Sequence, residues 1–210
     1  MSENLRRYYL QQMGIQPWLL RQVGSTQKNL VDLAAEVSVC KRCPLHKTRT
    51  QTVFSRGNPK ASLMIIGEAP GYHEDQQGLP FVGSAGSLLN RMLVSIGLSS
   101  EEVYIANVLK CRPPNNRDPE TEEIKQCCDY LKQQIAWVAP KLILGVGRFA
   151  GQFLLSSTVP LNKMRNNVHD YHGVPVLVSY HPAYLLRNPK DKKSAYRDLL
   201  LAKRLLIESS

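Results

Sequence analysis

Long hydrophobic runs are missing from this 210-residue sequence. The longest, at 63–67, 142–147 and 174–178, fall far short of the roughly 18 residues that span a bilayer. The first seven residues hold no apolar stretch of the signal-peptide type. Cysteine is also scarce, and its count of five is odd, which excludes a disulfide scaffold. We therefore expect a soluble, cytosolic chain whose thiols stay reduced, so that patterned cysteines indicate metal ligands or catalytic groups.

Acidic residues are outnumbered by basic ones. The chain has 17 Asp and Glu against 27 Lys and Arg, a formal net charge of +10. Such an excess favours a polyanionic partner, although it carries no information about the fold. The hydrophobic fraction of 43% is ordinary for a globular protein, and the length suits one domain with an appendage.

Hydrophobic patterning predicts strands that alternate with helices. Residues 1–37 are expected to form a helical N-terminal extension, with helices at 5–13 and 30–37, and residues 38–210 the main domain. Strands are expected at 63–67, 103–108, 141–146 and 174–180, and helices at 84–96, 119–138, 148–155 and 194–207. The helix at 119–138 is the clearest, because Asp118 can cap it and Pro119 suits its first position. This alternation predicts an α/β fold with a mainly parallel sheet, which binds ligands at the carboxyl ends of its strands.

The cysteines have the spacing of metal ligands. Cys40 and Cys43 form a C-x2-C pair, and Cys111 is followed by Cys127 and Cys128. Four thiolates from a loop, a strand end and a helix suit either zinc or an iron–sulfur cluster. We take Cys127 as the fourth ligand because it lies on the apolar stripe of its helix, whereas Cys128 does not. The alternative is that both are small core residues.

The segment at 67–86, after the first strand, is rich in glycine and proline, and its backbone is therefore shaped for a ligand. It lacks the Gly-Lys-Ser/Thr of a phosphate-binding loop. The alternative is a long solvated turn. A second glycine-rich motif, Gly145-x-Gly147-x-x-Ala150, matches the dinucleotide fingerprint, but no strand ending in an acidic residue follows it. We interpret these glycines as close strand–helix packing.

The last predicted strand leads into His181, at the edge where active sites are expected. Leu185 and Leu186 follow between a tyrosine and Arg187, with further lysines beyond. Apolar residues on a cation-flanked loop suit a wedge pushed between bases, while the cations bind phosphates. The alternative is that the leucines belong to the core.

Taken together and in order, these motifs resemble family 4 uracil-DNA glycosylases. They are GEAPG at 67–71, GLPFVG at 78–83, NVLKCRPP at 107–114 and HPAYLLR at 181–187, with the cysteine order noted above. The resemblance covers about residues 38–207. It implies a three-layer α/β/α fold with a short, mainly parallel central sheet, and excision of uracil from DNA in base-excision repair. It also implies a 4Fe–4S cluster held by Cys40, Cys43, Cys111 and Cys127.

The resemblance also implies roles in base recognition. Phe81 would stack on the flipped uracil, and Asn107 would read its edge through the side-chain amide. His181 would donate a hydrogen bond to O2 of the leaving base. Glu74 would shape the wall that faces C5, where the methyl group of thymine is refused.

The sequence does not identify the group that positions the attacking water. Other branches of the superfamily have an acidic residue where this sequence has Ala69. The candidates here are Glu68 and Asp75, and the alternative is that backbone carbonyls suffice. Contacts to DNA are expected from Leu185, Leu186 and Arg187, and from Lys163 and Arg165 in the loop at 161–165.

The expected partner is uracil-containing DNA, single- or double-stranded, bound by a monomer that is associated with the nucleoid and not with a membrane. Three alternatives remain. The first is an iron–sulfur protein that binds DNA without catalysis, and the second is a glycosylase for another deaminated base. The third is an enzyme that binds a free mononucleotide through the motif at Gly145.

Overall fold

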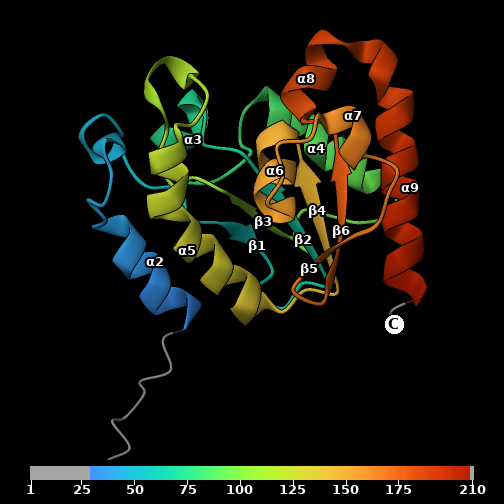
Figure 1. Ribbon diagram of the computed structural model, residues 1–210, viewed down its shortest axis with the longest axis horizontal. Helices are drawn as coiled ribbons and strands as arrows, with labels where there is room; N and C mark the ends of the chain where they lie inside the picture. The colour runs from blue at the N-terminus through green and yellow to red at the C-terminus, as the bar shows by residue number, and fades with distance from the viewer. Residues whose placement is uncertain (1–28, 209–210) are drawn as a thin grey trace, which may run out of the picture.

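The computed structural model describes residues 29–208, which form one six-stranded sheet between helices (Figure 1). The strands are β1 (Arg56–Gly57), β2 (Leu63–Gly67), β3 (Tyr104–Asn107), β4 (Leu142–Val146), β5 (His169–Tyr171) and β6 (Val174–Ser179). Their order across the sheet is β1-β3-β2-β4-β6-β5. The four central strands run parallel, and the edge strands β1 and β5 run antiparallel to their neighbours. The prediction of a mainly parallel sheet is confirmed.

The helices are α2 (Leu30–Ser38), α3 (Tyr72–Gln77), α4 (Ser84–Val94), α5 (Thr121–Val138), α6 (Arg148–Leu155), α7 (Leu161–Met164), α8 (Pro182–Arg187) and α9 (Lys192–Glu208). Short 3-10 turns lie at Pro44–Lys47, Pro114–Asn116 and Pro189–Asp191. The four strands and four helices predicted after residue 38 are all present. The edge strands β1 and β5 were missed because two or three residues show no periodicity.

Alternate residues of each central strand face opposite layers of helices. On one face, Ile65 packs with Leu89 of α4 and Leu199 of α9. On the other, Ile66 packs with Leu131 of α5, and α6 covers the same face. The expected three-layer α/β/α fold is therefore confirmed. Within residues 29–208 no helix combines the length and the apolar character needed to cross a membrane.

The second helix of the predicted N-terminal extension is α2, whereas the helix predicted at 5–13 lies outside the described residues. Asn29 caps α2, since its side-chain oxygen accepts hydrogen bonds from the next turn, including the N–H of Asp32 at 3.0 Å. Leu33 and Val37 are fully buried in a cluster with residues of α5. Helix α2 is thus built into the folded body.

Helix α5 begins two residues later than predicted, and Asp118 is not its cap. The carboxylate of Glu123 accepts a hydrogen bond from the N–H of Glu120 at 2.9 Å. Asp118 forms an ion pair with Arg148 of α6 instead, at 3.0 Å. The prediction of an Asp118 cap is therefore wrong, because this side chain is held by a partner 30 residues away.

Candidate active site

A cleft of about 450 Å³ opens at the carboxyl ends of the parallel strands. The segments after β2, β3 and β6 supply its walls, and α8 supplies one rim. Open parallel sheets bind ligands at this edge. Six residues predicted for the site line the cleft, namely Glu68, Glu74, Phe81, Asn107, His181 and Arg187. The fold thus brings together three segments that lie far apart in the sequence.

Phe81 has a strained backbone. Its φ is +56°, in the left-handed region that bulky residues seldom adopt. The ring is buried and lies 5.6 Å from the imidazole of His181, with the two planes inclined by 32°. Gly67 allows this arrangement, because a Cβ there would clash with the Phe81 ring and with the side-chain oxygen of Asn107. Strain held in place by its surroundings is typical of a functional site.

Glu74 fastens the loop that carries Phe81. Its Oε1 accepts hydrogen bonds from the N–H groups of Val82 at 3.0 Å and Gly83 at 3.1 Å. Its Oε2 accepts one from the N–H of Gly71, also at 3.1 Å. One carboxylate therefore joins the start of α3 to the start of α4 and fixes this wall of the cleft.

Gly86 of α4 faces the backbone of Phe81, and a Cβ there would overlap the Phe81 carbonyl group. We expect Gly86→Ala to lower the free energy of unfolding by about 1–3 kcal/mol, because the strained loop must move. Denaturant unfolding would measure this loss. Ser87→Ala is the matched control, since Ser87 is exposed on the same helix. Superimposable unfolding curves for the two variants would contradict the expectation.

Asn107 ends β3 and is anchored by an unusual partner. Its backbone oxygen accepts a hydrogen bond from the ammonium group of Lys110 at 2.7 Å. Lys110 is only 1% exposed, and burial lowers its pKa to about 8. Its own N–H donates to Sγ of Cys127 at 3.3 Å. Lys110 was missed because a lysine is expected to be exposed, and no signal in the sequence marks it as buried.

His181 is held as a neutral donor. Its Nδ1 accepts a hydrogen bond from the N–H of Ala183 at 3.2 Å, at the start of α8. Burial first, and then the charge of Arg187, lower the pKa of His181 to about 4, although Glu74 raises it. A neutral imidazole that accepts at Nδ1 carries its proton on Nε2. His181 therefore offers an N–H donor in the cleft that it lines.

Glu68 is the carboxyl group of the cleft whose acidity is most altered. Burial, followed by the negative charge of Asp118, raises the pKa of Glu68 to about 7, while Arg148 lowers it. A carboxyl group with this pKa is partly ionised at neutral pH and can accept a proton from water there.

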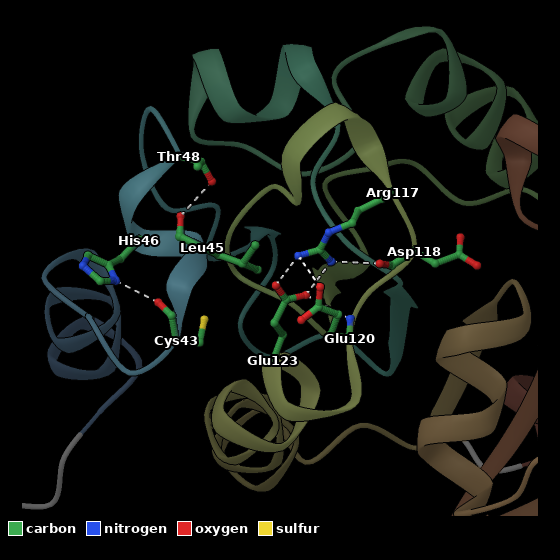
Figure 2. Close-up of polar contacts among 8 residues, drawn as sticks. All are labelled: Cys43, Leu45, His46, Thr48, Arg117, Asp118, Glu120 and Glu123. Atoms are coloured by element: carbon green, nitrogen blue, oxygen red, sulfur yellow. Dashed lines mark hydrogen bonds and ion pairs between the residues drawn. The ribbon is translucent and has the colours of Figure 1, made fainter.

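Two charged cleft residues in the segment after β3, Arg117 and Asp118, were not predicted. Arg117 donates two hydrogen bonds to the carboxylate of Glu123, at 2.6 and 2.9 Å. Figure 2 shows its guanidinium group reaching Glu120 as well. The run PNNRDP at 114–119 was the available signal, because a stretch of turn-forming residues between a strand and a helix is typical of ligand-binding loops.

Two charged residues predicted for the site are buried away from the cleft. Asp75 is buried, and its carboxylate accepts a hydrogen bond from the N–H of Thr50 at 3.0 Å. Arg165 is buried too, paired with Asp198 at 2.9 Å and stacked over the ring of Tyr180. The predictions that Asp75 positions water and that Arg165 contacts DNA are therefore wrong, since both charges are already engaged in the interior.

Of the two leucines predicted to form a wedge, one lies in the core and the other on the surface. Leu185 is 1% exposed and belongs to the core, whereas Leu186 is 38% exposed. Successive residues of a helix point about 100° apart, so both leucines of α8 cannot face DNA. The prediction for Leu185 is wrong. Arg187 lines the cleft, but Lys163 lines a different cavity with His169.

Cysteine side chains from three segments line one small cavity beside α2 and α5. They are Cys40 and Cys43 after α2, Cys111 after β3, and Cys127 in α5. Cys128 does not line this cavity, and its Sγ lies 3.2 Å from a backbone oxygen one turn earlier. The loop of Cys43 is folded back on itself, with His46 Nδ1 2.8 Å from the Cys43 oxygen (Figure 2).

The cavity of the four cysteines is also lined by cationic side chains, those of Arg42, Arg49 and Lys110. Arg49 donates a hydrogen bond to Sγ of Cys111 at 3.0 Å. Burial raises the pKa of Cys127 to about 12, so this thiol stays protonated unless a cationic group binds it. Among residues 29–208, no three His, Cys, Asp or Glu side chains converge closely enough to hold a single metal ion.

Comparison with known proteins gives a consistent result. Residues 54–203 match the family described as the Uracil DNA glycosylase superfamily. The chain is 46% identical over 171 residues to a Type-4 uracil-DNA glycosylase of Archaeoglobus fulgidus. The aligned region covers 78% of this chain and 86% of the relative. It is 42% identical over 188 residues to a Type-4 uracil-DNA glycosylase of Sulfurisphaera tokodaii, covering 85% and 86%. A third, from Saccharolobus solfataricus, is 43% identical over 187 residues, covering 85% and 87%.

Proposed function

Because the chain belongs to the uracil-DNA glycosylase superfamily, and within it to the type-4 enzymes, we propose that it removes uracil from DNA. It hydrolyses the N-glycosidic bond and so begins base-excision repair. The observation that carries this proposal is the meeting of Phe81, Asn107 and His181 in one cleft, each at the end of a different parallel strand or in the loop after it.

Base recognition needs an enclosed pocket for a nucleotide flipped out of the stack. Phe81 offers an aromatic face on which uracil stacks, and the amide of Asn107 donates to O4 and accepts from N3–H. Cytosine inverts the donor and acceptor at both positions, so an amide in a fixed orientation rejects it. Lys110 holds the backbone of Asn107 in place through the backbone carbonyl oxygen of that residue. The methyl group of thymine would meet the wall fastened by Glu74.

Bond cleavage leaves negative charge on the departing uracil and positive charge on the sugar. Nε2–H of His181 donates to O2, where the negative charge develops. With a pKa of about 4, the imidazole is neutral at pH 7 and acts as a hydrogen-bond donor, not as an acid that releases a proton.

We assign the positioning of the attacking water to Glu68. Because its pKa is about 7, the ionised form is lost as the pH falls, and the rate should fall about tenfold per pH unit below that value. Glu68→Gln is expected to abolish this acid limb and to lower the rate at about pH 8 by about 10²-fold. Single-turnover rates across this range test the assignment. An unchanged acid limb in the variant would assign the water to another group.

Contact with DNA is assigned to α8 and the segment that follows it. Leu186 fills the gap that the flipped nucleotide leaves, and Arg187 binds a phosphate. Lys190, Lys192 and Lys193 are exposed nearby, and the net charge of +10 suits a polyanion. One chain supplies every residue assigned here, so we propose a monomer that acts on cytoplasmic DNA.

The four cysteines are assigned to a 4Fe–4S cluster. Tetrahedral zinc holds its sulfur ligands roughly 3.8 Å apart, given bonds of about 2.3 Å, whereas the thiolates of a cluster bind separate irons. Four thiols that surround one cavity without converging on a point therefore suit a cluster. When bound, it would supply a covalent cross-link among the loop after α2, the segment after β3 and helix α5. The cysteines themselves take no part in cleaving the base.

Loss of one cluster ligand is expected to affect stability more than chemistry. We expect Cys111→Ala to remove most of the bound iron and to lower the free energy of unfolding by several kcal/mol, because metal binding and folding are coupled. Cys128→Ala is the control, since Cys128 is outside the cavity and should keep its iron. A Cys111→Ala protein that keeps its stability but lacks activity would contradict a purely structural role.

The proposed activity is tested by release of uracil from a synthetic strand that contains one uracil, using protein purified without chelators or air. Alkali-labile cleavage at uracil, with none at thymine or cytosine, is the expected result. Absence of release from folded, brown protein would favour DNA binding without catalysis. Strands that contain hypoxanthine or xanthine would then test for another deaminated base.

A further inference from the structure

Tyr72, the first residue of α3, is an exposed aromatic residue with no role in the proposed mechanism. Just over half of it, 54%, is exposed. The guanidinium group of Arg112 lies over its ring, 5.2 Å from the centroid. The imidazole of His73 meets the ring edge-on, with centroids 5.5 Å apart. The ring is therefore supported by its neighbours yet open to solvent.

The pair Tyr72 and Arg112 borders the cleft. Gly71 and Glu74, on either side of Tyr72 in sequence, both line it. Arg112 donates from Nε to the side-chain oxygen of Asn116 at 2.8 Å, and Asn116 also lines the cleft. The pair thus lies directly outside the wall of the site assigned to the excised base.

The charge of Arg112 is available to a ligand. Two other arginines near the cleft are engaged, Arg117 with Glu123 at 2.6 Å and Arg148 with Asp118 at 3.0 Å. In the part of the chain that the structure describes, no carboxylate is paired with Arg112. An aromatic ring beside an unpaired guanidinium group is the combination that binds nucleobases through stacking and their phosphates through charge.

We propose that Tyr72 and Arg112 form a stacking site for the unpaired nucleobase next to the excised uracil, which favours single-stranded substrates. This inference rests on the proposed function, because the base it describes is defined by the uracil in the cleft. The ligand is a nucleobase of the same DNA strand, and the site accepts any of the four because each has an aromatic face.

The fold places this site opposite the assigned wedge. Figure 1 shows α3 and α8 at the same edge of the sheet, on opposite sides of the strand ends. A strand that delivers uracil to the cleft between them meets Leu186 on one side and Tyr72 on the other. In single-stranded DNA the neighbouring base is free to turn onto Tyr72. In a duplex it is paired and stacked, so reaching Tyr72 requires a second base pair to open.

The test measures binding to DNA strands that cannot be cleaved, because an abasic tetrahydrofuran replaces the uracil. The fluorescent base 2-aminopurine stands beside the tetrahydrofuran. It is on the 5′ side in one strand and on the 3′ side in another. Stacking on Tyr72 should quench the fluorescence of 2-aminopurine in one of the two strands. Tyr72→Phe should retain the quenching, because the ring remains. Tyr72→Ala should abolish it and weaken single-strand binding by about 5- to 100-fold, the range for loss of one base–aromatic stack.

The matched control is Tyr196→Ala, which removes a tyrosine of α9 that is 43% exposed and does not line the cleft. It should bind like the wild type. Duplex binding by Tyr72→Ala should change by less than about twofold. Equal single-strand affinity and equal quenching in Tyr72→Ala and wild type would overturn the inference, even if uracil is released normally. Tyr72-dependent quenching in a protein that releases no uracil would instead overturn the proposed activity and leave the stacking site standing.

Discussion

Replacement of His181 by alanine is expected to slow uracil release by about 10²–10³-fold, the usual loss when one donor to a developing negative charge is removed. The reason lies in its tautomer. The N–H of Ala183 occupies Nδ1, so the proton is on Nε2 and the donor is in place before the bond breaks. Nothing has to reorganise as charge accumulates on O2.

Single-turnover release under saturating enzyme measures this loss without a contribution from product dissociation. His181→Gln should recover part of the rate because its amide can donate a hydrogen bond. The control is His172→Asn, at an exposed turn with φ of +51° that asparagine tolerates. Equal rates for His181→Ala and the wild type would remove His181 from the mechanism.

The same histidine makes stability depend on pH. Its folded pKa of about 4 lies below the ordinary value of 6.5, so the unfolded chain takes up a proton first as the pH falls. The stability that His181 contributes is therefore complete above pH 6.5 and is lost as the pH falls through about 4. Unfolding curves of the wild type should show this loss, and those of His181→Gln should show less of it.

Replacement of Asn107 by aspartate is expected to reduce uracil release by about 10⁴-fold, the scale of rejection when buried hydrogen-bonding groups no longer match. One carboxylate oxygen still accepts from N3–H of uracil. The other faces O4, so two acceptors oppose each other where the amide donated. Cytosine presents its amino group at this position, and the preference for uracil over cytosine should fall with the rate.

The variant Asn107→Ala removes the amide without reversing its hydrogen-bond donor and acceptor, so it distinguishes these two effects. It should slow uracil release by about 10²–10³-fold without any gain on cytosine. The measurement is release from strands that differ only in the target base. Thermal unfolding of both variants checks the fold, because Asn107 is buried. An unchanged ratio of uracil to cytosine release in Asn107→Asp would show that another group reads the base edge.

The helices and strands that were predicted correctly are those whose own residues show a clear hydrophobic pattern or clear boundary residues. Strands such as β2 and β4 are short apolar runs buried on both faces, and α6 is bounded by a glycine and a polar turn. Their ends differ from the prediction by two residues at most. Local contacts determine such elements, so a local pattern predicts them.

In the short helices α3 and α8, choices between adjacent residues could not be made from the sequence. Glu74 and Asp75 follow each other in α3, and only the first lines the cleft. Leu185 and Leu186 follow each other in α8, and only the second is exposed. One residue along a helix turns the side chain by about 100°, so an unknown helix orientation leaves such pairs undecided.

The sequence by itself determined the order of the motifs, the α/β class and the residue types available for base recognition and for the cysteine centre. Only the tertiary structure decided which charges are free. Arg165 is taken up by Asp198, 33 residues away, and Lys110 is buried between Asn107 and Cys127. The physical reason is that burial and ion pairing depend on neighbours brought close by the fold, and a charge leaves water only where such a partner meets it.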